Sequence, residues 1–175
     1  MTDDKRNSEN IDPELLEVAR EIFDAARRGD ATMLAAVIEK GVPPNLRNEK
    51  GDSLVMLAAY HGHADAVRVL LERGADPNLR NDNGQTPIAG AAFKGFKDVV
   101  ETLLANGADV EGASPDGRTA LMIAAMFNHT DMVELLIAHG ANPNARDANG
   151  VSPADAAARM GAPDTAALLA KKAGA

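Results

Sequence analysis

The 175-residue sequence contains no cysteine. Disulfide bonds, thiol nucleophiles and cysteine ligands for metals are therefore excluded, and the composition is compatible with a reducing compartment. Positive charge is also scarce, because 18 Lys and Arg stand against 26 Asp and Glu and give a formal net charge of −8. A chain of this sign has no general attraction for nucleic acid or for an anionic membrane, so we expect neither as a partner.

Long apolar segments are missing as well. No run approaches the roughly 18 apolar residues that a membrane-spanning helix needs. Residues 1–10 are polar and lack the apolar stretch of a secretory signal, so we expect a cytoplasmic protein. Residues 1–11 hold almost nothing that can be buried and are predicted to form a flexible tail. Residues 12–175 then form one domain.

Glycines recur with a period of 33 residues. One set is Gly51, Gly84, Gly117 and Gly150, and a second is Gly41, Gly74, Gly107 and Gly140. A fixed period of this length is typical of an array of one small unit. Within a unit, Thr86-Pro87 predicts the start of a short inner helix. A second helix follows, with apolar residues on one face of a 3.6-residue period, as at Val99, Val100, Leu103 and Leu104.

The residues around these glycines resemble the ankyrin repeat. Ser53–Ala59 and Thr119–Ala125 match in part the family's T-P-L-H-x-A-A stretch, and Gly74–Asn78 and Gly140–Asn144 match its G-A-D-x-N close. The resemblance covers about nine tenths of the chain. It implies an all-α ankyrin-repeat solenoid of stacked helix-turn-helix units with β-hairpin-like turns. We expect an N-terminal capping repeat at 12–46, full repeats at 47–79, 80–112 and 113–145, and a C-terminal capping repeat at 146–175, whose small residues suit an end without a neighbour.

The sequence offers little for catalysis. His61 and His63 form a candidate metal pair, but positions i and i+2 at a helix start do not face each other, and no third ligand lies near in sequence. No phosphate-binding glycine loop and no serine nucleophile elbow are found. We therefore predict no enzyme activity, no metal and no cofactor.

One row of positions is the candidate binding site. In ankyrin-like arrays the residues that follow the Ala-Ala pair of each inner helix line a concave groove. On this chain they form what we call the groove strip: Arg27, Arg28, Tyr60, His61, Phe93, Lys94, Met126, Phe127, Arg159 and Met160. The chain has one Tyr and four Phe, and three of these five rings fall in the strip. Clustered aromatics near Arg are typical of interface anchors. The alternative is that the rings form an outer layer of the core.

Three arginines near the turn glycines, Arg47, Arg80 and Arg118, belong to the predicted rim of the groove. They suit carboxylates on a partner protein, or they keep the edge of the turns solvated. The strip and the rim together predict a monomeric protein-binding adaptor or regulator. Two alternatives stay open. One is an inhibitor or immunity protein that covers a partner enzyme, and the other is a self-associating structural array that buries the aromatic strip between copies.

Two positions depart from the repeat pattern. Gly90 stands where neighbouring units have Leu57 and Ile123. A glycine inside a helix costs about 1 kcal/mol relative to alanine, so we predict that a bulky neighbour, Phe93 or Phe96, needs the space. Asn128 stands where other units have glycine, and asparagine tolerates a positive φ.

Overall fold

The structure, a computed structural model, describes residues 12–174. These residues form ten α-helices: α1 Pro13–Arg28, α2 Ala31–Glu39, α3 Leu54–Tyr60, α4 Ala64–Glu72, α5 Pro87–Lys94, α6 Lys97–Ala105, α7 Ala120–Met126, α8 Thr130–Ala138, α9 Pro153–Met160 and α10 Pro163–Ala173. Over the same range the only β-type pairing outside the helices is one antiparallel bridge, between Arg47 and Ser53. The predicted all-α class is confirmed. The predicted tail at 1–11 lies outside the described residues.

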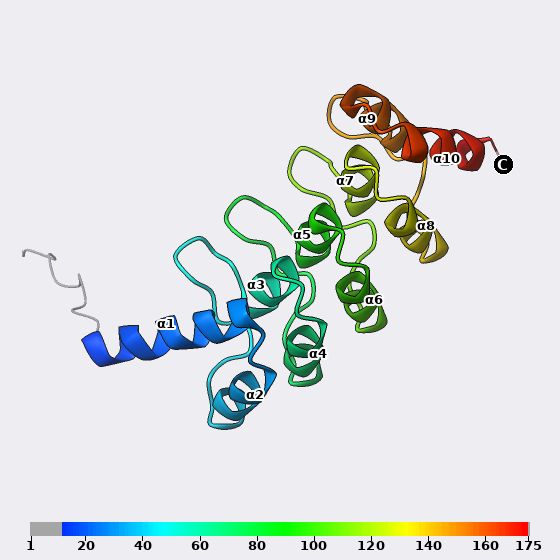
Figure 1. The fold of residues 1–175 in the computed structure, drawn as a ribbon. Helices are drawn as coiled ribbons and strands as arrows, with labels where there is room; N and C mark the ends of the chain where they lie inside the picture. The colour runs from blue at the N-terminus through cyan, green and yellow to red at the C-terminus, as the bar shows by residue number, and fades with distance from the viewer. Residues whose placement is uncertain (1–11, 175) are drawn as a thin grey trace, which may run out of the picture.

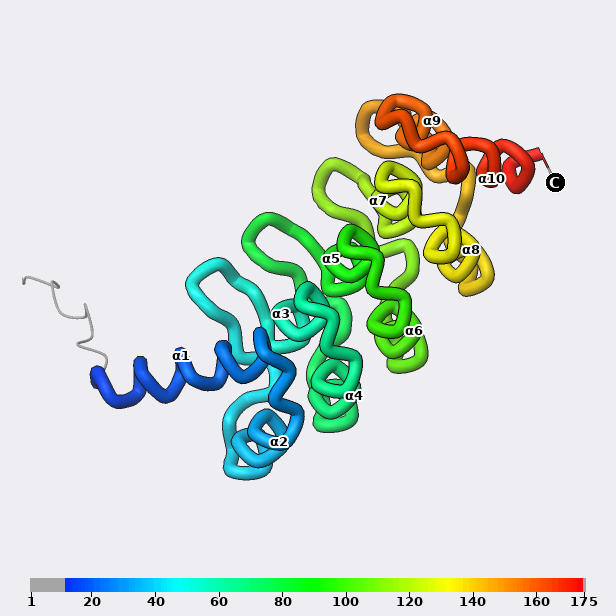
Figure 2. The backbone as a smooth tube through the Cα atoms, viewed as in Figure 1, coloured from blue at the N-terminus to red at the C-terminus, as the bar shows by residue number. Residues whose placement is uncertain are grey.

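The helices alternate between two rows in an elongated array (Figure 1). The inner row is α1, α3, α5, α7 and α9, in which each helix packs against the next, and the outer row is α2, α4, α6, α8 and α10. Long loops project beside the inner row, as Figure 2 shows. The pairs α3–α4, α5–α6 and α7–α8 lie within the predicted units 47–79, 80–112 and 113–145.

Hydroxyl side chains start the inner helices. Ser53, Thr86, Thr119 and Ser152 each accept a hydrogen bond from the backbone N–H three residues later. Thr86 and Thr119 are buried, so this bond also satisfies a hydroxyl that water does not reach. The outer helices end at periodic glycines, because Gly41, Gly74, Gly107 and Gly140 have φ of 88° to 104°, which L side chains rarely adopt.

Small residues let the inner helices approach one another closely. The paired alanines are fully buried, at positions 25 and 26, 58 and 59, 91 and 92, and 124 and 125. Branched side chains from the outer helices, such as Val67, Val100 and Leu136, fill the space behind them. One continuous core therefore runs along the array, and each unit contributes to it through its neighbours.

An aromatic or imidazole ring packs at the contact between neighbouring units. His63, Phe96 and His129 precede the outer helices α4, α6 and α8. Each ring lies over a glycine that follows the inner helix of the preceding unit: Gly29, Gly62 and Gly95. The Nε2 of His63 donates to the carbonyl oxygen of Arg27 at 2.8 Å. The two histidines therefore have a structural role at the contact between units. Phe96 belongs to the same series and faces Gly62.

The prediction that Phe93 or Phe96 requires the glycine at position 90 is wrong. The atoms nearest to a side chain built at Gly90 belong to Tyr60 and Met56, and they lie at ordinary van der Waals distance. Phe96 is used at the joint with Gly62 instead. Phe93 and Phe96 are close to position 90 in the sequence, but their side chains make other contacts.

The first inner helix is longer than the others. Helix α1 has 16 residues; Asp12 caps its start by accepting from the N–H of Glu14, and Gly29, in the left-handed conformation, follows its last residue. The other inner helices have seven or eight residues. The first half of α1 extends away from the stack and exposes Leu15, Leu16 and Val18 (Figure 1).

Candidate functional site

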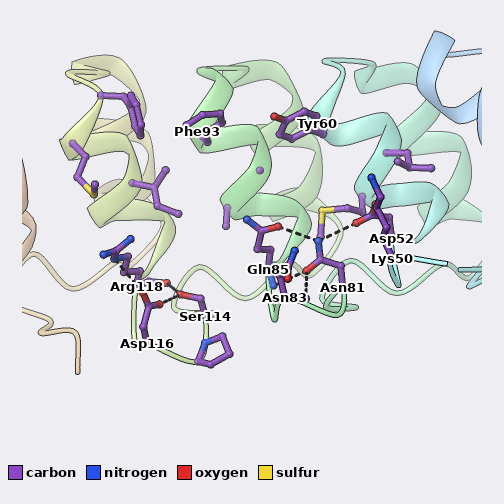
Figure 3. Close-up of a pocket in the computed structure, with 18 residues that line it drawn as sticks. Lys50, Asp52, Tyr60, Asn81, Asn83, Gln85, Phe93, Ser114, Asp116 and Arg118 are labelled. Carbon is purple, nitrogen blue, oxygen red and sulfur yellow. Dashed lines mark hydrogen bonds and ion pairs between the residues drawn. The ribbon is translucent and has the colours of Figure 1, made fainter. Parts of the chain in front are cut away.

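A groove of about 810 Å³ lies between the inner helices α3, α5 and α7 and the loops that precede them. Its helix side is mainly apolar: Met56, Leu57, Tyr60, Ala89, Gly90, Phe93, Ile123, Met126 and Phe127. Its loop side is mainly polar: Lys50, Asp52, Asn81, Asn83, Gln85, Ser114, Pro115, Asp116 and Arg118. Figure 3 shows Tyr60 and Phe93 on the helix side, with the polar residues on the loops opposite.

Three rings form a row along the helix side of the groove. Tyr60, Phe93 and Phe127 are 39%, 40% and 41% exposed. The rings of Tyr60 and Phe93 are nearly parallel, with centroids 6.5 Å apart. Phe93 and Phe127 meet edge to face at 4.8 Å. Contacts of this kind hold the rings in place while leaving two fifths of each residue open to solvent. The row therefore offers a prearranged apolar surface that crosses three units.

The positive charges of the groove strip differ in how far they are neutralised. Arg27 pairs with Asp24 and Arg28 with Glu21, each at 2.6 Å. Lys94 instead lies over the Tyr60 ring, with Nζ 4.9 Å from the centroid, a cation–π contact. Within residues 12–174, neither Lys94 nor Arg159 has a carboxylate within ion-pair distance. The open positive charge of the strip therefore rests on these two residues.

His61 ends α3 beside the Tyr60 ring, at a centroid distance of 5.7 Å. Burial lowers the pKa of His61, and the positive charges of His63, Arg27 and Lys94 lower it further. The rings of His61 and His63 lie side by side with centroids 6.5 Å apart. The expectation that they do not face each other is wrong, because both residues lie in the turn between α3 and α4, where helical spacing does not apply. No group of three metal-ligating side chains occurs among the described residues.

The groove gathers only part of the predicted strip. Tyr60, Phe93, Met126 and Phe127 line the cavity. The other strip residues lie outside its lining: Arg27, Arg28, His61, Lys94, Arg159 and Met160. Met160 is exposed at the end of α9, one unit beyond the cavity.

The rim arginines divide in the same way. Arg47 donates to the carbonyl oxygens of Gly51 at 3.0 Å and of Arg80 at 2.8 Å. Arg80 repeats this arrangement and donates to the carbonyl oxygens of Gly84 and Ala113. Each guanidinium thus joins its loop to a residue one period later. Arg118 alone of the three lines the groove, where Nε lies 3.2 Å from the carboxylate of Asp116.

The loop side of the groove holds polar residues besides Arg118, and the prediction of the rim did not include Asn81 or Ser114. The Nδ2 of Asn81 donates to Asp52 at 2.9 Å and to Gln85 at 3.0 Å. The hydroxyl of Ser114 donates to Asp116, and this bond, helped by the charge of Arg118, lowers the pKa of Asp116. All these residues lie within four positions of a turn glycine. Their recurrence beside the turn glycines could have identified them in the sequence, because residues at such positions of successive repeats lie on the same side of the array.

The comparison with known families adds to this geometry. The family model described as ankyrin repeats (3 copies) matches residues 22–113 and 110–175. The chain belongs to the ankyrin repeat family. Ankyrin repeats generally serve as protein–protein interaction modules, and the family is generally non-enzymatic.

One curated relative comes from Pseudomonas aeruginosa (strain PAO1) and is named "Putative ankyrin repeat protein PA3287". It is 57% identical to this ankyrin repeat chain over 61 residues, or 35% of the chain. The matched segment spans 34% of that relative's length. Among residues 12–174, no helix is long and apolar enough to span a membrane. The cytoplasmic location stays a prediction.

Proposed function

We propose that this ankyrin repeat chain is a non-enzymatic adaptor or regulator that binds a partner protein in its groove and acts as a monomer. The observation that carries the proposal is the row of half-exposed rings at Tyr60, Phe93 and Phe127, which lines the groove. Rows of exposed aromatic residues are uncommon on surfaces that bind nothing, and a few such anchors usually dominate an interface. The net charge of −8 opposes association between copies of the chain.

The loop side supplies the polar part of such an interface. Asn81, Gln85 and Ser114 present amide and hydroxyl groups opposite the rings. A partner segment between the two sides can bury apolar side chains against the rings and form hydrogen bonds with the loops. This division into an apolar centre and a polar edge is usual in protein interfaces.

The test is affinity capture from a lysate of the native host, followed by mass spectrometry and by measurement of Kd for the captured protein. We expect Tyr60→Ala, Phe93→Ala and Phe127→Ala each to weaken binding, with at least one losing about thirtyfold. The matched controls are Arg68→Ala and Glu101→Ala, at exposed positions of α4 and α6 in the outer row, which should leave Kd unchanged. Equal affinity for all five variants would overturn the proposal.

A further inference from the structure

Gly90 has no role in the backbone geometry of its helix. Within residues 12–174 it is the one glycine inside a helix, α5, and it is not among the residues with positive φ. Any L residue can adopt such a conformation. Because glycine lowers helix stability by about 1 kcal/mol relative to alanine, the choice of glycine here needs another reason.

Packing within the chain does not supply that reason. A Cβ at position 90 would lie 3.5 Å from Cδ2 of Tyr60 and 3.8 Å from the sulfur of Met56. Both are ordinary van der Waals distances, and no other contact within 4 Å is formed with the described residues. Alanine therefore fits at this position, and the fold gains nothing from its absence. Local choices that cost stability without a structural return are typical of functional sites.

The place of Gly90 in the groove shows what the glycine leaves free. Gly90 lines the helix side of the cavity in the middle unit, and the corresponding positions one period away carry Leu57 and Ile123. At Gly90 the groove therefore lacks the aliphatic side chain that the neighbouring units carry, and we call the space that such a side chain would take, beside Tyr60 and Met56, the notch. Lys94, one turn further along the same helix, has no carboxylate partner within residues 12–174.

We propose that the notch at Gly90 receives one aliphatic side chain of an acidic partner segment, while Lys94 pairs with a carboxylate of that segment. This inference rests on the proposed function of the groove. The size of the side chain follows from the residues that fill the same position in the neighbouring units. The acidic character follows from charge complementarity, because the strip has no acidic residue and its open positive charge rests on Lys94 and Arg159.

The experiment uses the full chain and a phage-displayed library of random linear peptides as the probe. Selected peptides are synthesised, and their Kd values are measured for the wild-type chain and for Gly90→Leu, Lys94→Ala and Phe127→Ala. We expect the peptides to share an aliphatic residue near an acidic one, and Gly90→Leu to bind them at least about tenfold more weakly. Lys94→Ala should weaken binding and reduce its dependence on salt.

A size exchange makes the test specific to the notch. Replacing the shared aliphatic residue of the peptide by alanine should cost about tenfold with the wild-type chain and much less with Gly90→Leu, since the leucine already fills the space. If Gly90→Leu fails to fold by circular dichroism, Gly90→Ala replaces it, with a smaller loss expected. The peptide substitution on the wild-type chain alone then decides the matter, and an unchanged Kd overturns the proposal.

The outcomes separate the notch from the groove. Peptides that lose affinity for Phe127→Ala but bind Gly90→Leu as tightly as the wild type would refute the notch and leave the groove function in place. Peptides that bind all variants equally would overturn both. A library that yields no binding peptide would overturn the linear acidic segment as the partner of this site.

Discussion

The side-chain oxygen of Asn128 accepts a hydrogen bond from the backbone N–H of Thr165, 3.2 Å away and 37 residues later in the chain. It also accepts one from the N–H of Asp164 at 3.1 Å. Helix α10 begins after Ala162, which has no side-chain acceptor of its own. Asn128 has φ of 58°, and its side chain reaches this helix start. The preceding unit therefore provides the N-terminal cap of the last helix.

Asn128→Gly isolates this cap, because glycine adopts the same positive φ without the side-chain oxygen. We expect the free energy of unfolding to fall by about 1 kcal/mol, measured by urea titration. Asn106→Gly is the control, since among the described residues the side chain of Asn106 donates only to the carbonyl oxygen of Thr102 in its own helix. Equal losses in the two variants would show that the hydrogen bonds of Asn128 contribute nothing.

Removal of residues 147–175 should expose the unit that they cover. The face that becomes open includes Leu121 and Leu136, which are fully buried in the complete chain, and Ile123. We expect a lower melting temperature by circular dichroism and association in light scattering, because a solenoid is held together by contacts between neighbouring units. A truncated chain that stays monomeric and melts at the same temperature would show that α9 and α10 do not stabilise the stack.

Gly90→Ala should stabilise the chain by about 0.5 to 1 kcal/mol. The added methyl group finds ordinary contacts with Tyr60 and Met56, and alanine restricts the unfolded chain more than glycine does. The measurement is the midpoint of denaturation by urea. A lower midpoint would mean that the space at position 90 is required for packing.

Phe96→Ala should be more damaging than Phe93→Ala. The ring of Phe96 packs against the core and over Gly62 at the joint between units, so its removal leaves a cavity and should cost about 3 kcal/mol. Phe93 is 40% exposed and contacts the rings of Tyr60 and Phe127, so its removal should cost about 1 kcal/mol. Urea titration of both variants compares them directly. The reverse order would place the groove rings in the core.

The lowered pKa of His61 links stability to pH. The unfolded chain protonates His61 more readily than the folded chain does. At a pH above the usual histidine pKa of about 6.5 the residue is neutral in both states, and the folded chain keeps its full stability. Part of this stability is lost as the pH falls toward the lowered value of the folded chain. We expect His61→Gln to lose less stability than the wild type between about pH 8 and about pH 5. Melting curves of both proteins across this range test the difference, and parallel curves would contradict it.

Much of the fold was predictable because capping residues and glycines mark the ends of the helices in each repeat. The start of α1 at Asp12, its end at Gly29 and the left-handed glycines after the outer helices follow from local capping rules. The same rules predicted that Asn128 tolerates a positive φ. The neighbouring places of Tyr60 and Phe93 also followed from the period of 33, since equal positions in successive units lie side by side. Phe127 is one residue beyond the equal position, which Met126 holds, and it still meets Phe93 edge to face.

The contacts between units were harder to predict. Arg47 was predicted either to pair with a carboxylate of a partner or to keep the edge of the turn solvated, and neither alternative included the bond that its guanidinium donates to the carbonyl oxygen of Arg80 in the next loop. The contacts at Gly90 depend on where Tyr60, from the preceding unit, places its ring. Such contacts arise from the distance and angle between stacked units, which a one-dimensional pattern does not contain. The sequence pattern therefore predicts the helices of each unit but not which side chains of two neighbouring units touch.

Side-chain hydrogen bonds between neighbouring units span short stretches of sequence. The shortest separation is 29 positions, as at Asn78 and Gly107, and the longest is 40, at Ala125 and Thr165. Short contacts of this kind favour rapid folding, because little chain entropy is lost when each is formed. During synthesis a unit can dock as soon as it emerges, since the surface that it needs has already been made. The open apolar edge moves along the growing chain, and α10 covers the edge left by α7 and α8 when it meets Asn128.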